Sequence, residues 1–95
     1  MLVKVQYLGI LRAKLRMPER TYEVKEGATV SDLLGKLAEI HGDFLKKLFD
    51  ADRKNILDPS FVITVNGVLV DRLRGLETRL KNGDTITIMS LISGG

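Results

Sequence analysis

Phe61-Val62-Ile63-Thr64-Val65-Asn66-Gly67-Val68-Leu69-Val70 is the stretch that decides the fold. Two runs rich in β-branched and apolar residues lie on either side of Asn66-Gly67, and that dipeptide is typical of a two-residue hairpin turn. Such a turn joins antiparallel strands. The sequence therefore predicts a hairpin with strands at 61–65 and 68–70.

Alternation of apolar and polar residues predicts three further strands, at 2–8, 21–25 and 85–89. Successive side chains of a strand point to opposite faces of the sheet, so one face of each strand is expected to be buried. The residues expected to point into the core are Val3, Val5, Tyr7, Tyr22, Val24, Ile86 and Ile88. Those of the last strand expected to face outward are Thr85, Thr87 and Met89.

The clearest helical signal begins at Thr29, a residue type that is favoured as an N-cap. Asp32, three residues later, can complete a variant of the capping box, in which each side chain bonds to the backbone N–H of the other residue. Apolar residues then recur at helical spacing, and Gly42 stands where a C-cap glycine belongs. The predicted apolar stripe consists of Leu33, Leu34, Leu37, Ala38 and Ile40. A shorter helical segment is expected at 44–49, followed by a polar loop at 50–59.

Ninety-five residues form one domain that can bury a core without disulfides. The order of the elements predicts an α+β fold in which one main helix packs across a mixed sheet of four or five strands. Residues 1–90 would form the folded domain and residues 91–95 an extended tail. One face of the sheet would bury the helix, and the other would be left for solvent or a partner.

Composition argues against several classes of protein. Fifteen basic and twelve acidic residues leave a net charge of +3, too small an excess to indicate nucleic-acid binding. The absence of cysteine excludes disulfides and thiolate metal sites on this chain. No apolar run approaches the roughly 20 residues that span a bilayer, and the amino end lacks a signal-peptide pattern, so we expect a cytoplasmic protein.

A metal site is not expected either, because the one histidine, His41, has no cysteine or second histidine nearby. It stands at the end of the predicted helix, where a cation suits the helix dipole, and we expect a structural role for it. The exposed cations are expected to form a solvated rim, with an acidic partner surface as the alternative. They include Arg12, Lys14, Arg16, Arg72, Arg74 and Arg79.

The chain ends on Leu91-Ile92-Ser93-Gly94-Gly95, directly after the last predicted strand. Two glycines offer little steric bulk, so such an end can thread a narrow cleft where a side chain would clash. Five extended residues reach roughly 17 Å, enough to enter a neighbour's active site. Our hypothesis is that the chemistry takes place on the carboxylate of Gly95; the alternative is a terminal pair of glycines that arose by chance.

Taken together, these features resemble the β-grasp sulfur carriers, the ubiquitin-like family of the molybdopterin synthase small subunit, the thiamin sulfur carrier and the ubiquitin-related modifier. The resemblance covers essentially the whole chain. The segments that carry it are 7–12 (YLGILR), 29–34 (TVSDLL), 65–67 (VNG), 80–84 (LKNGD) and the terminal Gly94-Gly95.

The resemblance implies that Gly95 is adenylated by an activating enzyme of the ubiquitin-E1 type, which uses Mg-ATP. A persulfide from a sulfurtransferase then displaces AMP and leaves a thiocarboxylate on Gly95. This thiocarboxylate passes its sulfur to an acceptor, above all in molybdopterin synthesis, where the partner is the large subunit of molybdopterin synthase. The chain itself would be no enzyme and would bind no cofactor.

The sequence departs from the molybdopterin-type members, which commonly carry a proline pair before the terminal glycines. Residues 89–93 (MSLIS) resemble instead the ending of the ubiquitin-related modifiers. Sulfur donation to tRNA or thiamin and conjugation to lysines of other proteins therefore remain alternatives. An RNA-binding module is disfavoured, because the five aromatic residues lie mostly at expected core positions.

Partner docking is expected on the exposed sheet face and along the strand that leads to the tail. Met89, Leu91 and Ile92 are apolar and have no evident core to enter. Grouped exposed apolar residues often mark an interface. Ordinary packing at the edge of the domain is the alternative.

Overall fold

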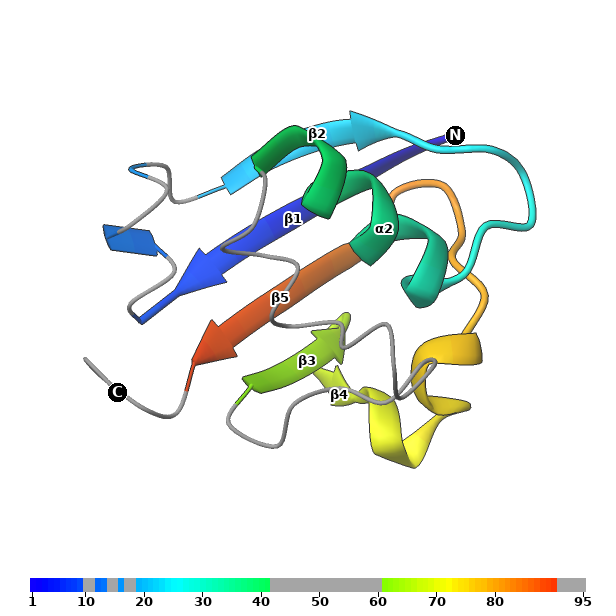
Figure 1. Ribbon diagram of the computed structural model, residues 1–95. Coiled ribbons are helices and arrows are strands. Elements are labelled where there is room, and N and C mark those ends of the chain that lie inside the picture. Colours follow the sequence, from blue (N-terminus) through cyan, green and yellow to red (C-terminus); the bar gives the residue numbers. More distant parts are fainter. Residues whose placement is uncertain (10–11, 14–15, 17–18, 42–60, 91–95) are drawn as a thin grey trace.

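The computed structural model describes residues 1–9, 12–13, 16, 19–41 and 61–90. They form a five-stranded sheet in the order β2-β1-β5-β3-β4 (Figure 1). The strands are β1 (Leu2–Leu8), β2 (Glu19–Glu23), β3 (Phe61–Val65), β4 (Val68–Leu69) and β5 (Thr85–Ser90). The helical elements are α2 (Val30–His41) and the 3-10 turns η2 (Val70–Arg72) and η3 (Gly75–Glu77).

The last strand of the chain occupies the centre of the sheet. β5 pairs in parallel with β1, so that Val5 lies opposite Ile86, and antiparallel with β3, so that Ile63 lies opposite Ile88. β1–β2 and β3–β4 are antiparallel. The sheet is therefore mixed, as predicted, and the strand that precedes the tail is hydrogen-bonded on both sides.

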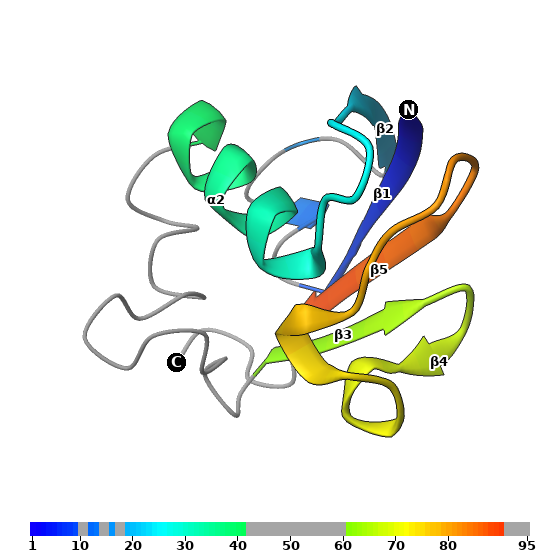
Figure 2. The same ribbon diagram turned by 90° about the vertical axis from the view of Figure 1, so that its right-hand side faces the viewer.

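The helix α2 lies across one face of this sheet (Figure 2). The helix begins with a complete capping box. The Thr29 N–H donates to Asp32 Oδ2 at 2.9 Å, and the Asp32 N–H donates to Thr29 Oγ1 at 3.2 Å. Val30, Leu33, Leu34, Leu37 and Ala38 are buried beneath it. The chain thus forms the β-grasp arrangement of a mixed sheet with a helix packed across it, as predicted.

The prediction for Ile40 was wrong, because its side chain is 49% exposed. Ile40 follows Lys36 by one helical turn, and Lys36 Nζ donates a hydrogen bond to the Glu23 carbonyl on the edge strand β2. This side of the helix therefore faces the edge of the sheet rather than its centre, and the apolar surface of Ile40 stays accessible.

The core lies between α2 and the sheet. The predicted inward residues of β1 and β5, Val3, Val5, Tyr7, Ile86 and Ile88, are at most 1% exposed, and Tyr22 and Val24 are also buried. Leu76 and Leu80, which lie between η2 and β5, are buried too. The second predicted strand begins and ends two residues earlier than expected, at Glu19 and Glu23.

The predicted hairpin is confirmed at its turn. Asn66 and Gly67 have φ angles of 53° and 85°, the left-handed values that a type I′ turn requires at both central positions. The second strand of the hairpin is shorter than predicted, because Val70 already belongs to η2. The predicted C-cap Gly42, the helical segment at 44–49 and the loop at 50–59 lie outside the described residues.

Helices long and apolar enough to cross a bilayer are absent from the described part of the chain.

Candidate functional site

The predicted tail continues from the central strand. β5 ends at Ser90, which lies opposite Phe61 of β3, so the strand is paired through its last residue. Five of the predicted site residues, Leu91, Ile92, Ser93, Gly94 and Gly95, lie outside the described residues, and their assignment stays a prediction. Met89 is the predicted site residue that the structure describes.

Met89 is half-buried on the face of the sheet that α2 does not cover. The register places Leu8 of β1 on one side of it and Val62 of β3 on the other. Leu8 is 39% exposed and Val62 is half-buried. Three apolar side chains from three neighbouring strands thus form one row directly before the tail, and we call Leu8, Val62 and Met89 the apolar row.

The rest of the open face carries both polar and apolar side chains. In the next row Thr87 Oγ1 donates to Gln6 Oε1 at 3.1 Å. Farther along β1, Lys4 Nζ forms an ion pair with Glu19 Oε2 of β2 at 3.4 Å, between two half-exposed side chains. Leu2, at the far end of β1 on this face, is 52% exposed, so apolar surface occurs at both ends of the open face, and the apolar row is distinguished by lying beside the origin of the tail.

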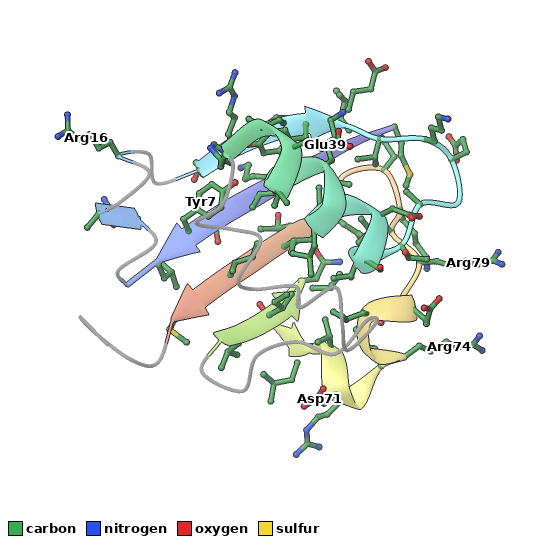
Figure 3. The ribbon with its side chains drawn as sticks, in the orientation of Figure 1. Tyr7, Arg16, Glu39, Asp71, Arg74 and Arg79 are labelled. Atoms are coloured by element: carbon green, nitrogen blue, oxygen red, sulfur yellow. The ribbon has the colours of Figure 1, made fainter. Side chains whose placement is uncertain are left out.

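On the opposite face of the same end, a buried hydrogen-bonded cluster joins β1, β2 and α2. The Tyr7 and Tyr22 hydroxyls lie 3.2 Å apart, and the Tyr22 hydroxyl lies 3.2 Å from His41 Nε2. The Tyr7 and His41 rings meet edge to face at 6.1 Å, and the Arg20 guanidinium lies 5.9 Å from the centroid of the Tyr22 ring. Figure 3 shows Tyr7 between β1 and the helix.

Electrostatics keep this cluster neutral. Burial, reinforced by the hydrogen bond between the Tyr7 and Tyr22 hydroxyls, raises the pKa of the Tyr7 phenol far above its usual value. Burial and the nearby Arg20 cation lower the pKa of His41. Desolvation and Arg20 thus act against the favourable interaction of a His41 cation with the helix dipole. His41 instead joins the helix to the sheet through Tyr22.

The described residues contain no group of three His, Asp or Glu side chains that could hold a metal ion. What the end of the sheet offers is an apolar surface beside the origin of the tail. Such a surface is typical of protein docking.

Sequence reasoning found Met89 but missed Leu8 and Val62. Alternation within each strand could have placed both on the open face, since they neighbour the inward residues Tyr7 and Ile63. The pairing of β1 and β3 with opposite sides of β5 is a tertiary property, and it alone brings these side chains to Met89.

Comparison with known proteins agrees with this geometry. Residues 5–95 match the sequence profile of the ThiS family. A protein of Archaeoglobus fulgidus, named as a candidate sulfur carrier protein, is 37% identical over 70 residues, which span 74% of this chain and 77% of that protein.

Solved structures of the same kind also match. The small archaeal modifier protein 1 of Methanosarcina acetivorans superposes with a TM-score of 0.80 at 33% identity, over 99% of this chain and 96% of that one. A candidate molybdopterin converting factor subunit 1 from Pyrococcus furiosus superposes with a TM-score of 0.75 at 27% identity, over 97% of this chain and 99% of that one. The chain thus shares its fold with sulfur carriers and with protein modifiers.

Proposed function

The chain belongs to the ThiS family of small sulfur carriers, and from this premise we propose that it carries sulfur as a thiocarboxylate on Gly95. The observation that carries the proposal is the family match, which extends through the terminal Gly94-Gly95. The position of β5 supports it, because a strand paired on both sides gives the tail a fixed origin.

The first step makes the carboxyl group reactive. A free α-carboxylate has a pKa near 3.5, so at neutral pH it is an anion and a poor electrophile. In the proposed step a carboxylate oxygen of Gly95 attacks the α-phosphorus of ATP on an E1-like partner, and pyrophosphate leaves. The product is an acyl-adenylate, whose AMP is a good leaving group.

The second step exchanges oxygen for sulfur. The terminal sulfur of a persulfide on the sulfurtransferase attacks the carbonyl carbon of Gly95, and AMP leaves with its oxygen. The resulting acyl disulfide is then cleaved by a thiol, which is oxidised to a disulfide as the thiocarboxylate is released. This chain contains no cysteine, so the proposed thiols belong to the partners.

Docking of the activating partner is proposed for the apolar row together with Leu91 and Ile92 of the tail. A partner that covers Leu8, Val62 and Met89 would bury apolar surface at roughly 25 cal/mol per Å². It would also receive the tail in one direction, because the row is continuous with β5. In this proposal the chain supplies binding and a reactive terminus, and the catalytic side chains and Mg-ATP belong to the partner.

For the acceptor we propose molybdopterin synthesis, with the large subunit of molybdopterin synthase as the receiving partner. The similarity to the Pyrococcus furiosus molybdopterin converting factor supports this choice. A second candidate is conjugation of the same activated Gly95 to lysines, and the higher identity to the archaeal modifier favours it. Both functions need the same adenylate and differ in the nucleophile that attacks it.

The test is to purify the protein from its own cells with an alkylating agent present and to measure the mass of its C-terminal fragment. Alkylated sulfur on Gly95 is the expected result. The fragment is needed because intact mass confuses sulfur exchange with oxidation of one of the three methionines. An unmodified Gly95 whose fragment is instead joined to lysines of other proteins would establish the modifier, and finding neither product would refute both candidates.

A further inference from the structure

A shallow groove lies at the end of the sheet opposite to the tail. Its lining residues are Leu73, Arg74, Thr78 and Arg79. These residues, all between positions 73 and 79, precede the start of β5 in the chain, whereas the tail follows the other end of that strand. Figure 3 shows Arg74 and Arg79 projecting from the same side of the molecule, away from the end of β5. The groove is therefore separate from the apolar row.

The backbone of the groove is held rigidly. Thr78 is buried, and its hydroxyl accepts a hydrogen bond from the Arg74 N–H at 3.0 Å and donates one to the Gly75 carbonyl at 2.7 Å. Its carbonyl accepts from the Val30 N–H of α2 at 2.9 Å. Arg79 forms a β-bridge with Thr29. Because these groups of the backbone are already hydrogen-bonded, fewer of them need to be ordered when a partner binds, which lowers the entropy cost of binding.

The groove combines positive charge with apolar surface. Residues 70–81 contain four basic residues and two acidic ones (Asp71 and Glu77), a local net charge of 4 − 2 = +2. The side chain of Leu73 is 42% exposed, and Arg74 and Arg79 are exposed beside it. The ion pair found among the described residues joins Lys4 to Glu19, so it involves neither arginine.

We infer that this groove binds an acidic, leucine-containing segment of a partner protein. Carboxylates of the segment pair with the guanidinium groups of Arg74 and Arg79, which present several donors in a planar fork. An apolar side chain between those carboxylates packs on Leu73. The inference goes beyond the function proposed above and does not depend on it.

The composition of the groove favours a protein over a nucleic acid. Single-stranded nucleic acids are bound by stacking bases on aromatic side chains, and among the residues that the structure describes the lining of this groove contains no aromatic side chain. The exposed leucine would gain nothing from a phosphate backbone. Because the groove and the tail lie at opposite ends of β5, a partner could hold the carrier here while Gly95 occupies another protein's active site.

The experiment is a titration of the full-length, isotope-labelled chain with a short synthetic peptide of glutamate and leucine, followed by amide chemical shifts at about 0.15 M salt. The expected result is saturable shifts at Leu73, Arg74, Thr78 and Arg79. The double variant Arg74→Glu, Arg79→Glu is expected to bind about tenfold more weakly. Lys25→Glu, a charge reversal at an exposed position outside the groove, is expected to bind as the wild type does.

Three results would overturn the inference. The first is the absence of saturable shifts at these amides. The second is a loss of binding free energy in Lys25→Glu that is about half of the loss in the double variant, since their net charges change by −2 and −4, and this would indicate attraction by net charge alone. The third is tighter binding of a short single-stranded RNA, or of the same peptide with glutamine in place of glutamate. Amide spectra of both variants check that they fold. None of the three results bears on the sulfur chemistry of Gly95.

Discussion

Tyr22 on the edge strand β2 and His41 at the end of α2 share a hydrogen bond of 3.2 Å between Oη and Nε2. Tyr7 adds its hydroxyl to Tyr22, so the three side chains form a chain of donors and acceptors. When Nε2 of a neutral His41 carries no proton, Tyr22 donates to His41 and Tyr7 can donate to Tyr22. A proton on Nε2 would make His41 the donor, so the Tyr22 hydroxyl would lose its acceptor on His41 and would have to turn its own hydrogen elsewhere.

Stability is therefore expected to fall as the pH drops below the ordinary pKa of histidine, 6.5. His41 has a folded-state pKa below its ordinary value of 6.5, so its contribution is fully present above 6.5 and is lost as the pH falls through the folded pKa. Urea unfolding at several pH values measures this slope. His41→Gln, which cannot titrate, is expected to show a shallower slope in the same window, and an unchanged slope would contradict the role of His41.

Tyr22→Phe is expected to destabilise the protein more than Tyr7→Phe does. Tyr7→Phe removes one hydrogen bond and should cost about 1 kcal/mol, whereas Tyr22→Phe leaves the buried Tyr7 hydroxyl unpaired and should cost about 2 kcal/mol. The free energy of unfolding in urea measures both. The double variant should cost less than the sum of the two, and strict additivity would show that the hydroxyls do not interact.

Asp84→Asn is expected to cost about 2 kcal/mol of stability. One oxygen of the Asp84 carboxylate accepts from Asn66 Nδ2 at 2.9 Å and the other from the Lys81 N–H at 2.7 Å, and an amide can accept with only one of its two positions. Asp71→Asn is the matched control, because Asp71 is exposed, and its cost should stay within about 0.5 kcal/mol. Equal costs for the two variants would show that the Asn66–Asp84 contact contributes nothing.

Leu8→Asp is expected to weaken activation by the E1-like partner without unfolding the domain. A charge in the apolar row would be buried on docking, so kcat/KM for ATP–pyrophosphate exchange should fall by about tenfold or more. Leu2→Asp is a close control, since Leu2 is on the same strand and face and is 52% exposed, but lies at the other end. A similar loss in both variants would place docking elsewhere.

Addition of one residue after Gly95 is expected to abolish adenylation while the melting temperature stays unchanged. The extension moves the terminal carboxylate by about 3.5 Å and places a peptide bond where the reactive group should be. ATP–pyrophosphate exchange with the activating enzyme measures the loss. One added residue at the amino end is the control, and full activity of the C-terminal extension would refute chemistry at Gly95.

Much of this fold follows from local patterns in the sequence. The hairpin turn at Asn66-Gly67 and the capping box of Thr29 and Asp32 involve neighbouring residues, so their chemistry is readable without the rest of the chain. The inward faces of β1 and β5 follow from alternation. The exposure of Ile40 could not be predicted in this way. Helical spacing identifies an apolar stripe, but it does not show where the sheet beneath the helix ends.

The candidate site likewise contains some residues that the sequence alone could identify and others that only the structure brings together. The terminal Gly94-Gly95 and Met89 were visible in the sequence, whereas the neighbours of Met89 were not. The tyrosine–histidine cluster was also hidden, because Tyr7, Tyr22 and His41 come from three separate elements. The basic residues Arg74 and Arg79 were expected to form a solvated rim, and only the buried Thr78 between them shows that their backbone is fixed.

The sequence by itself determined the elements, their buried faces and the glycine terminus, because periodicity, turn chemistry and capping depend on residues close in the chain. Only the tertiary structure decided that β5 lies between β1 and β3, and hence that Leu8 and Val62 flank Met89. The order of strands in the sheet depends on how the whole chain buries its apolar surface. A local sequence pattern therefore does not show which strands become neighbours.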